Sequence, residues 1–208
     1  MMKSSSNLIP GATSKSKTAL AIALSISLFA TACSTQWISI ALADLPVLTQ
    51  MALNIGTIIS TLQSGQQISS ADATAIQNIS SQASKDLNLL QSLYNDYNSN
   101  HSTSGLQKIQ SVIADINQSL PALLQAAHIG DPVLSARVAA GVNLILTTVA
   151  SFAALIPQTS ARPTAQRMAH PTIAVPKASD LKKQWNQQVC GPIGNSTLDV
   201  SRTGCLVR

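Results

Sequence analysis

The chain has 208 residues, enough for one ordinary domain with extensions, and only 10% of them are charged, against a usual share of about 25%. Its formal charge of +5 is unevenly divided, because residues 33–157 hold three basic and six acidic side chains while the segments on both sides are basic. A nucleic-acid partner is not expected, since that would require basic residues clustered on one folded face with a supporting motif.

The N-terminal 32 residues have the pattern of an export signal. Residues 1–18 are polar and contain three lysines and no acid, and residues 19–32 are apolar with small residues toward the end. The apolar stretch is shorter than the roughly 20 residues that span a bilayer. We therefore predict that residues 1–32 are a signal peptide.

The signal ends in the sequence FATACS. Ala30, Ala32 and Cys33 resemble the lipobox of bacterial lipoproteins, although Ala30 stands where leucine is usual. The resemblance implies cleavage before Cys33 and attachment of diacylglycerol to its thiol, and Ser34 resembles the sorting pattern of the Gram-negative outer membrane. The alternatives are plain secretion, with the cut after Ala32, and an uncut signal anchor.

Residues 33–43 are predicted to be a membrane-proximal tether in which Trp37 lies at the membrane interface. The alternative is that this stretch extends the first helix into the core. The first helix is expected to start near Asp44, with Pro46 in its first turn, and to end at Gly65.

Three further helices are expected over residues 70–157. Ser69 and Ser70 are good caps for the second helix, which should give way to a polar loop over residues 98–105. The third helix, over 106–127, contains apolar residues at alternating steps of three and four, and Gly130 should end it in the left-handed conformation.

The fourth helix should be capped by Asp131, with Pro132 in its first turn and Pro157 after its end. Its uncharged run over residues 138–156 allows a transmembrane alternative, although polar side chains within the run favour a buried helix. Residues 44–157 are therefore predicted to form an antiparallel, up-down four-helix bundle, an all-α fold.

The tail divides into a flexible basic linker over residues 158–179 and a small element over residues 180–208. The small element should contain a short helix, capped by Ser179 or Asp180, and a loop closed by a disulfide between Cys190 and Cys205. Lipidation of Cys33 would leave these two cysteines as an even pair. Two free thiols are the alternative.

No catalytic or metal-binding pattern is evident. The chain has no glutamate, and its three histidines, at positions 101, 128 and 170, show no spacing typical of metal ligands. Met51 is expected to fill core space, and Asp86 and Asp115 to lie on the solvated side. No enzyme activity, cofactor or metal is predicted.

Two groups of side chains are candidates for recognition. Trp185 with Lys182 and Lys183 could touch anionic headgroups or cell-wall polymer, or Trp185 could instead dock on the bundle. Tyr94 and Tyr97 could form an aromatic patch or pack the bundle end.

The sequence thus predicts a non-enzymatic lipoprotein of the outer membrane that faces the periplasm. It would serve as a structural or interaction module for an envelope protein or cell-wall partner. The alternatives are a bundle that carries a small apolar ligand and a membrane-inserting helical protein.

Overall fold

The computed structural model describes residues 36–62, 68–156, 175–191 and 205. These residues form five helices and no strand, which confirms the predicted all-α class. The predicted signal peptide, Cys33, His170 and nearly all of the predicted linker and disulfide loop lie outside the described residues.

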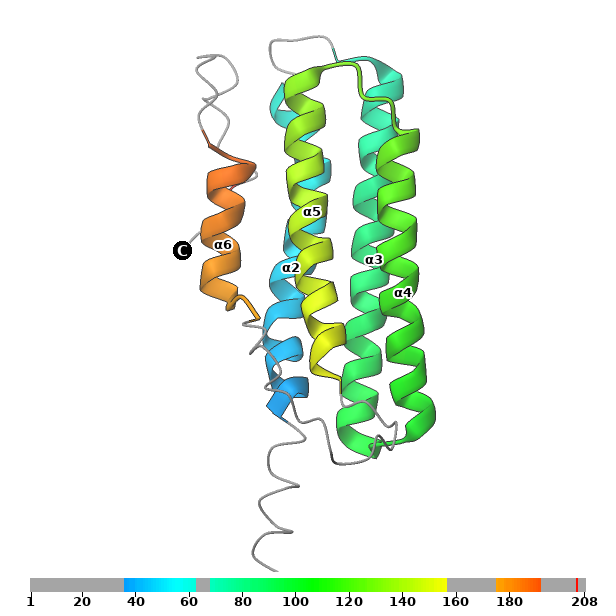
Figure 1. Ribbon diagram of the computed structural model, residues 1–208. Coiled ribbons are helices and arrows are strands. Elements are labelled where there is room, and N and C mark those ends of the chain that lie inside the picture. The colour runs from blue at the N-terminus through cyan, green and yellow to red at the C-terminus, as the bar shows by residue number, and fades with distance from the viewer. Residues whose placement is uncertain (1–35, 63–67, 157–174, 192–204, 206–208) are drawn as a thin grey trace, which may run out of the picture. The chain divides into compact units, whose positions relative to one another are not determined.

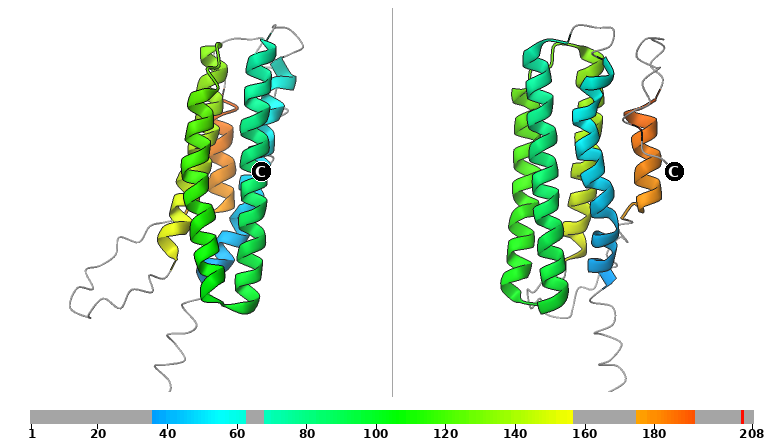
Figure 2. Two further views of the ribbon diagram at one scale, coloured as in Figure 1. Left: turned by 90° about the vertical axis from the view of Figure 1, so that its right-hand side faces the viewer. Right: turned by 180° about the vertical axis from the view of Figure 1, so that it is seen from behind.

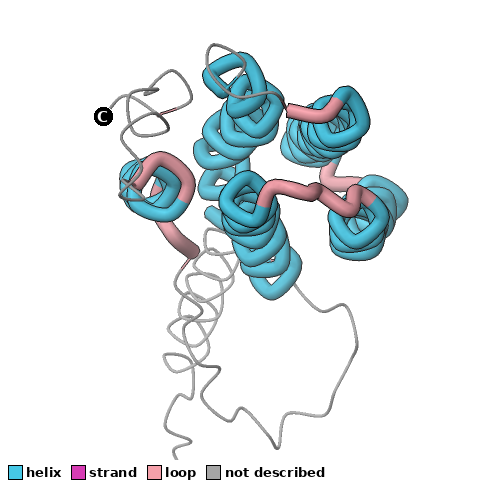
Figure 3. Tube along the Cα trace, turned by 90° about the horizontal axis from the view of Figure 1, so that it is seen from above, coloured by secondary structure: helices cyan, strands magenta, loops and turns pink. Residues whose placement is uncertain are grey.

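The five helices are α2 (Gln36–Leu62), α3 (Ser70–Asn100), α4 (Thr103–Ala126), α5 (Pro132–Leu155) and α6 (Ala178–Gln188). Four of them, α2 to α5, run alongside one another as a helical bundle (Figure 1). The shorter α6 lies outside this group, next to α2 and α5, as the rear view and the view along the helices show (Figures 2 and 3).

The first helix begins earlier than predicted. It starts at Gln36, so the expected start near Asp44 is wrong, and Pro46 lies inside the helix on its exposed side. Trp37 and Ile38 are buried in the core. Burial of these apolar side chains stabilises the two additional turns, so residues 36–43 extend the first helix, as in the alternative reading, and do not form a separate tether.

The connection between α3 and α4 is also shorter than the polar loop expected over residues 98–105. The turn is made by His101, which adopts the left-handed conformation (φ 47°), and by Ser102. The His101 N–H donates to the Tyr97 carbonyl, and the Ser102 hydroxyl accepts from the Gly105 N–H. Because both helix ends are capped within two residues, a longer loop is not needed.

The connection between α4 and α5 contains one correction. Asp131 caps α5 by accepting hydrogen bonds from the Val133 and Leu134 N–H groups, and Pro132 opens the helix, as predicted. The left-handed residue after α4, however, is His128 (φ 43°) and not Gly130. The Gly130 N–H instead donates to the Asp72 side chain in the first turn of α3, at 3.3 Å. This contact ties the link to α3.

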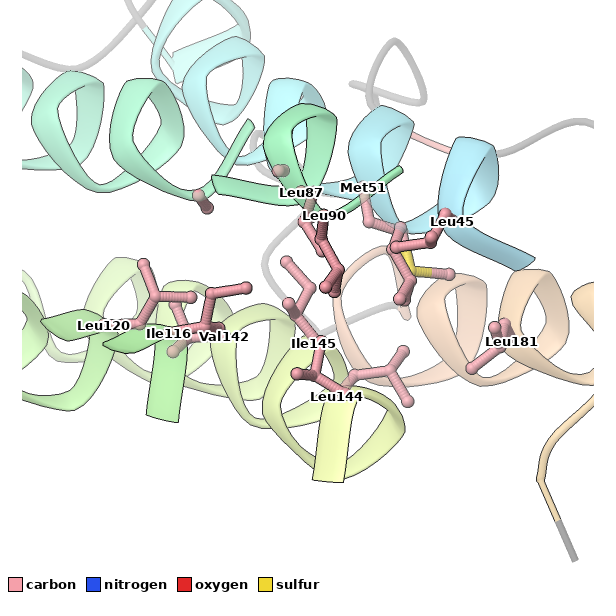
Figure 4. Packing of buried hydrophobic residues seen from close by; sticks show 14 of the residues in the cluster. Leu45, Met51, Leu87, Leu90, Ile116, Leu120, Val142, Leu144, Ile145 and Leu181 are labelled. Carbon is pink, nitrogen blue, oxygen red and sulfur yellow. The ribbon is translucent and has the colours of Figure 1, made fainter. Parts of the chain in front are cut away.

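The core is a single apolar cluster that receives side chains from all five helices. Met51 lies fully buried in it, as predicted, α6 contributes Leu181 and Trp185, and the residue after α6 contributes Val189. Figure 4 shows labelled side chains from the different helices facing one another: Leu45, Met51, Leu87, Leu90, Ile116, Leu120, Val142, Leu144, Ile145 and Leu181. The close approach of α2 to α3 is marked by a buried hydrogen bond of 2.7 Å from the Ser80 hydroxyl to the Ala52 carbonyl.

Candidate functional site

Trp185, the aromatic member of the predicted recognition element, is fully buried. Its six-membered ring lies over Gly141 of α5, where an added Cβ would come within 3.0 Å of Trp185 Cζ3. A residue with a Cβ at this position would force the indole to shift by a few tenths of an ångström. Trp185 is therefore not an exposed recognition residue but the contact by which α6 docks on the bundle, while Lys182 is half-buried and Lys183 is exposed.

The N-terminus of α6 is capped by a residue from another helix. The position before the helix is Lys177, which makes no capping bond, so the predicted caps Ser179 and Asp180 are wrong. Both lie inside the helix. The buried carboxylate of Asp44 in α2 instead accepts a hydrogen bond from the Ala178 N–H. This bond supplies one of the partners that the first N–H groups of a helix lack.

Burial raises the pKa of the Asp44 carboxyl above its usual value, and the hydrogen bond from the Ala178 N–H lowers it in part. A pKa raised in the folded state means that protonation favours folding. The contribution is fully present below the unfolded pKa of about 3.9 and is lost as the pH rises through the folded pKa. Asp44 therefore holds the start of α6 through a hydrogen bond, but burial of its charge lowers the stability of the folded protein at neutral pH.

Two substitutions separate the effect of the hydrogen bond to the Ala178 N–H from the effect of the buried charge. At pH 7, Asp44→Asn should be as stable as the wild type or more stable, because the amide oxygen still accepts the bond without a buried charge. Asp44→Ala should be less stable than Asp44→Asn by about 0.5–2 kcal/mol, the usual range for a lost helix cap. Urea unfolding at several pH values measures the free energy of unfolding of each protein. The stability of the wild type relative to that of Asp44→Asn should increase as the pH falls toward 4. A constant difference between them would rule out the raised pKa.

The other end of α6 has one further contact with the bundle and is followed by the disulfide. The guanidinium of Arg137 in α5 donates to the Gly191 carbonyl at 3.2 Å. The predicted disulfide between Cys190 and Cys205 is present, with the two Cα atoms 5.9 Å apart. The C-terminal element is thus attached to the bundle at the start, middle and end of α6.

An aromatic cluster occupies the end of the bundle where α2 begins. Trp37 contacts Tyr94 and Tyr97 with ring centroids 5.5 and 5.8 Å apart, and Tyr94 also contacts Phe152 of α5 at 6.4 Å. Tyr94 is fully buried and Tyr97 half-buried, so the two tyrosines pack the bundle end and do not form an exposed patch.

The Tyr94 hydroxyl is buried without a hydrogen-bond partner among the described residues. Burial also raises the pKa of this phenol, so the group stays neutral at ordinary pH. A buried polar group without a partner costs about 1–3 kcal/mol. Tyr94→Phe should therefore raise the free energy of unfolding by about 1 kcal/mol. Thermal unfolding tests this, with Tyr97→Phe as the matched control, and a loss of stability in Tyr94→Phe would reveal a hidden partner.

A surface pocket of about 290 Å³ lies at the same end, between the last turns of α3 and the first turns of α4. It is lined by Leu93, Asp96, Tyr97, Asn100, Ser102, Ser104, Gly105 and Lys108. Its one side-chain amide, its hydroxyls and its two opposite charges suit a polar group better than an apolar ligand.

The remaining candidates stand apart from one another. His101 and His128 are exposed at opposite ends of α4, Asp115 is exposed, and Asp86 is half-buried and accepts hydrogen bonds from Gln82. Within the described ranges, no three histidine, cysteine or acidic side chains come together as a metal site would require.

Two helices, Gln36–Ile59 and Pro132–Leu155, are long and apolar enough to cross a membrane by length and composition. About half of each segment is buried inside the bundle, and core helices of soluble proteins have the same character. This observation is weak support for the membrane-inserting alternative.

Sequence reasoning missed the roles of Asp44 and Gly141. Asp44 resembled a helix start because Pro46 follows it, and Gly141 carried no signal beyond a glycine inside a helix. Both act through α6, which is more than 35 residues away in the sequence.

The sequence matches no protein-family model, and comparison with curated proteins and with solved structures finds no significant match.

Proposed function

We propose that the protein is an exported, lipid-anchored protein of the bacterial cell envelope, acting as a non-enzymatic structural or interaction module. The observation that carries this proposal is the order of three features: an export-signal pattern, a lipobox-like cysteine at position 33, and a packed helix that begins at Gln36. The order is that of an acylated N-terminus placed directly before a folded domain.

Two structural features support the proposal. The disulfide between Cys190 and Cys205 is typical of an oxidising compartment such as the periplasm. The apolar core is occupied by the chain's own large side chains, among them Trp185, Tyr94 and Phe152, which favours a structural module over a carrier of an apolar ligand.

We also infer that α2 to α5 form the up-down four-helix bundle, with α6 as an added helix outside it. The two-residue turn at His101 and Ser102 requires α3 and α4 to run in opposite directions, and the short link at residues 127–131 requires the same of α4 and α5. The Ser80–Ala52 hydrogen bond places α2 beside α3.

Fractionation of cells that express the wild type or Cys33→Ala tests the function. The wild type should be found with the outer membrane and released only by detergent, and Cys33→Ala should lose this association. A variant that stays with the membrane would contradict the lipid anchor and favour direct insertion of α2 or α5.

A further inference from the structure

The start of α2 is fixed to one end of the bundle. Trp37 lies in the first turn and is only 6% exposed, because its ring contacts Tyr94 and Tyr97 of α3. Tyr97 in turn contacts the ring of His101, the residue that makes the turn into α4, with centroids 5.5 Å apart. The beginning of α2 and the turn between α3 and α4 therefore belong to the same end.

Little chain lies between this end and Cys33. Only Ser34 and Thr35 separate Cys33 from Gln36. Three residue steps span at most about 10 Å, even when the chain is fully extended. An acyl group on Cys33 would therefore hold this end of the bundle close to the bilayer, whereas a tether up to Asp44 would have allowed any orientation.

The exposed surface at this end has a distinctive composition. Seven consecutive residues, 98–104, are exposed and form what we call the hairpin face. They are Asn98, Ser99, Asn100, His101, Ser102, Thr103 and Ser104, with no acid and no lysine or arginine. Beside them, the side chains of Asp96 and Lys108 contribute one charge of each sign to the rim of the pocket.

We infer that the hairpin face lies against the lipid headgroups, so that the helices stand on the membrane with the α4–α5 link pointing away from it. This inference rests on the proposed acylation of Cys33. Amide and hydroxyl groups hydrogen-bond to the phosphate and ester oxygens of headgroups. Because the face has no net charge, binding needs no anionic lipid, and the partner is a surface of zwitterionic headgroups.

Labels at the two ends of the bundle test the orientation. Asn98 on the hairpin face and Gln125 in the last turn of α4 are both exposed and polar, which makes Asn98→Cys and Gln125→Cys a matched pair. The 24 residues of α4 separate the two ends by about 36 Å. Each variant, purified from membranes and labelled with a fluorophore, is placed in phosphatidylcholine vesicles that carry a nitroxide on the headgroup.

Quenching should be at least threefold stronger at position 98 than at position 125, and adding anionic lipid should leave this ratio unchanged. Equal quenching, which indicates helices lying flat, or stronger quenching at position 125 would overturn the inference. The mass of the N-terminal peptide from the same samples reports acylation. An acylated protein with the wrong quenching pattern overturns the orientation alone, whereas an unmodified Cys33 on a protein that does not bind vesicles overturns the proposed function as well.

Discussion

Replacing Trp185 by alanine is expected to lower the free energy of unfolding by about 3–5 kcal/mol, the usual range for removing a fully buried large aromatic side chain. Trp185 is the central contact of α6, and its fully buried indole packs closely against Gly141 of α5. Urea unfolding measures the loss, with Trp37 as the remaining fluorescent reporter since the chain has only two tryptophans.

Lys183→Ala is the control for this substitution, because Lys183 lies on the same helix and is exposed. Its effect should stay within about 0.5 kcal/mol. Amide hydrogen exchange shows whether α6 detaches as a unit in Trp185→Ala, in which case protection is lost over residues 178–189 first. A change below about 1 kcal/mol, with α6 still protected, would mean that Trp185 does not hold the helix.

Removal of the disulfide is the second large effect. Cys190 and Cys205 are 15 positions apart, and closing a loop of this size stabilises the folded state by about 3 kcal/mol in the chain-entropy model. The double variant Cys190→Ser, Cys205→Ser should lose about this amount. Because Val189, the residue before Cys190, is buried in the core, part of the loss should appear as weaker docking of α6.

The comparison is best made in a Cys33→Ala background, so that only one pair of thiols is present. Denaturant unfolding with and without reductant should give two different stabilities for the Cys33→Ala protein and a single value for the variant that also lacks Cys190 and Cys205. If reductant leaves the stability of the Cys33→Ala protein unchanged, the two sulfurs are not bonded in solution.

Local signals in the sequence located several helix ends well. Ser69 starts α3 and Asp131 with Pro132 starts α5 because each of these features acts within one turn of its own helix. The all-α class follows in the same way from apolar residues repeated at steps of three and four.

The errors arose where tertiary contacts outweigh local preference. Asp44 and Pro46 look like the start of a helix, yet burial of Trp37 and Ile38 continues α2 back to Gln36. The polar run at 98–105 looks like a loop, yet three of its residues complete α3 and three begin α4, because His101 and Ser102 cap both helix ends and leave no residues for a longer loop.

Less of the candidate site was predictable. The docking of α6 depends on pairs far apart in the sequence, Asp44 with Ala178 and Gly141 with Trp185, and no spacing rule connects them. The proposed lipid attachment at Cys33 is a different case, because it would depend on an enzyme that recognises the sequence around Cys33 and not on the packing of the folded chain.

The central claim, acylation of Cys33, is tested most directly by the mass of the N-terminal peptide of the native protein. A peptide that begins at Cys33 and carries the mass of a diacylglycerol group is the predicted result. A peptide that begins at an unmodified Cys33, or any other cleaved N-terminus, would contradict the lipid anchor and leave the protein as a secreted helical bundle, whereas an uncut N-terminus would contradict it in favour of a signal anchor.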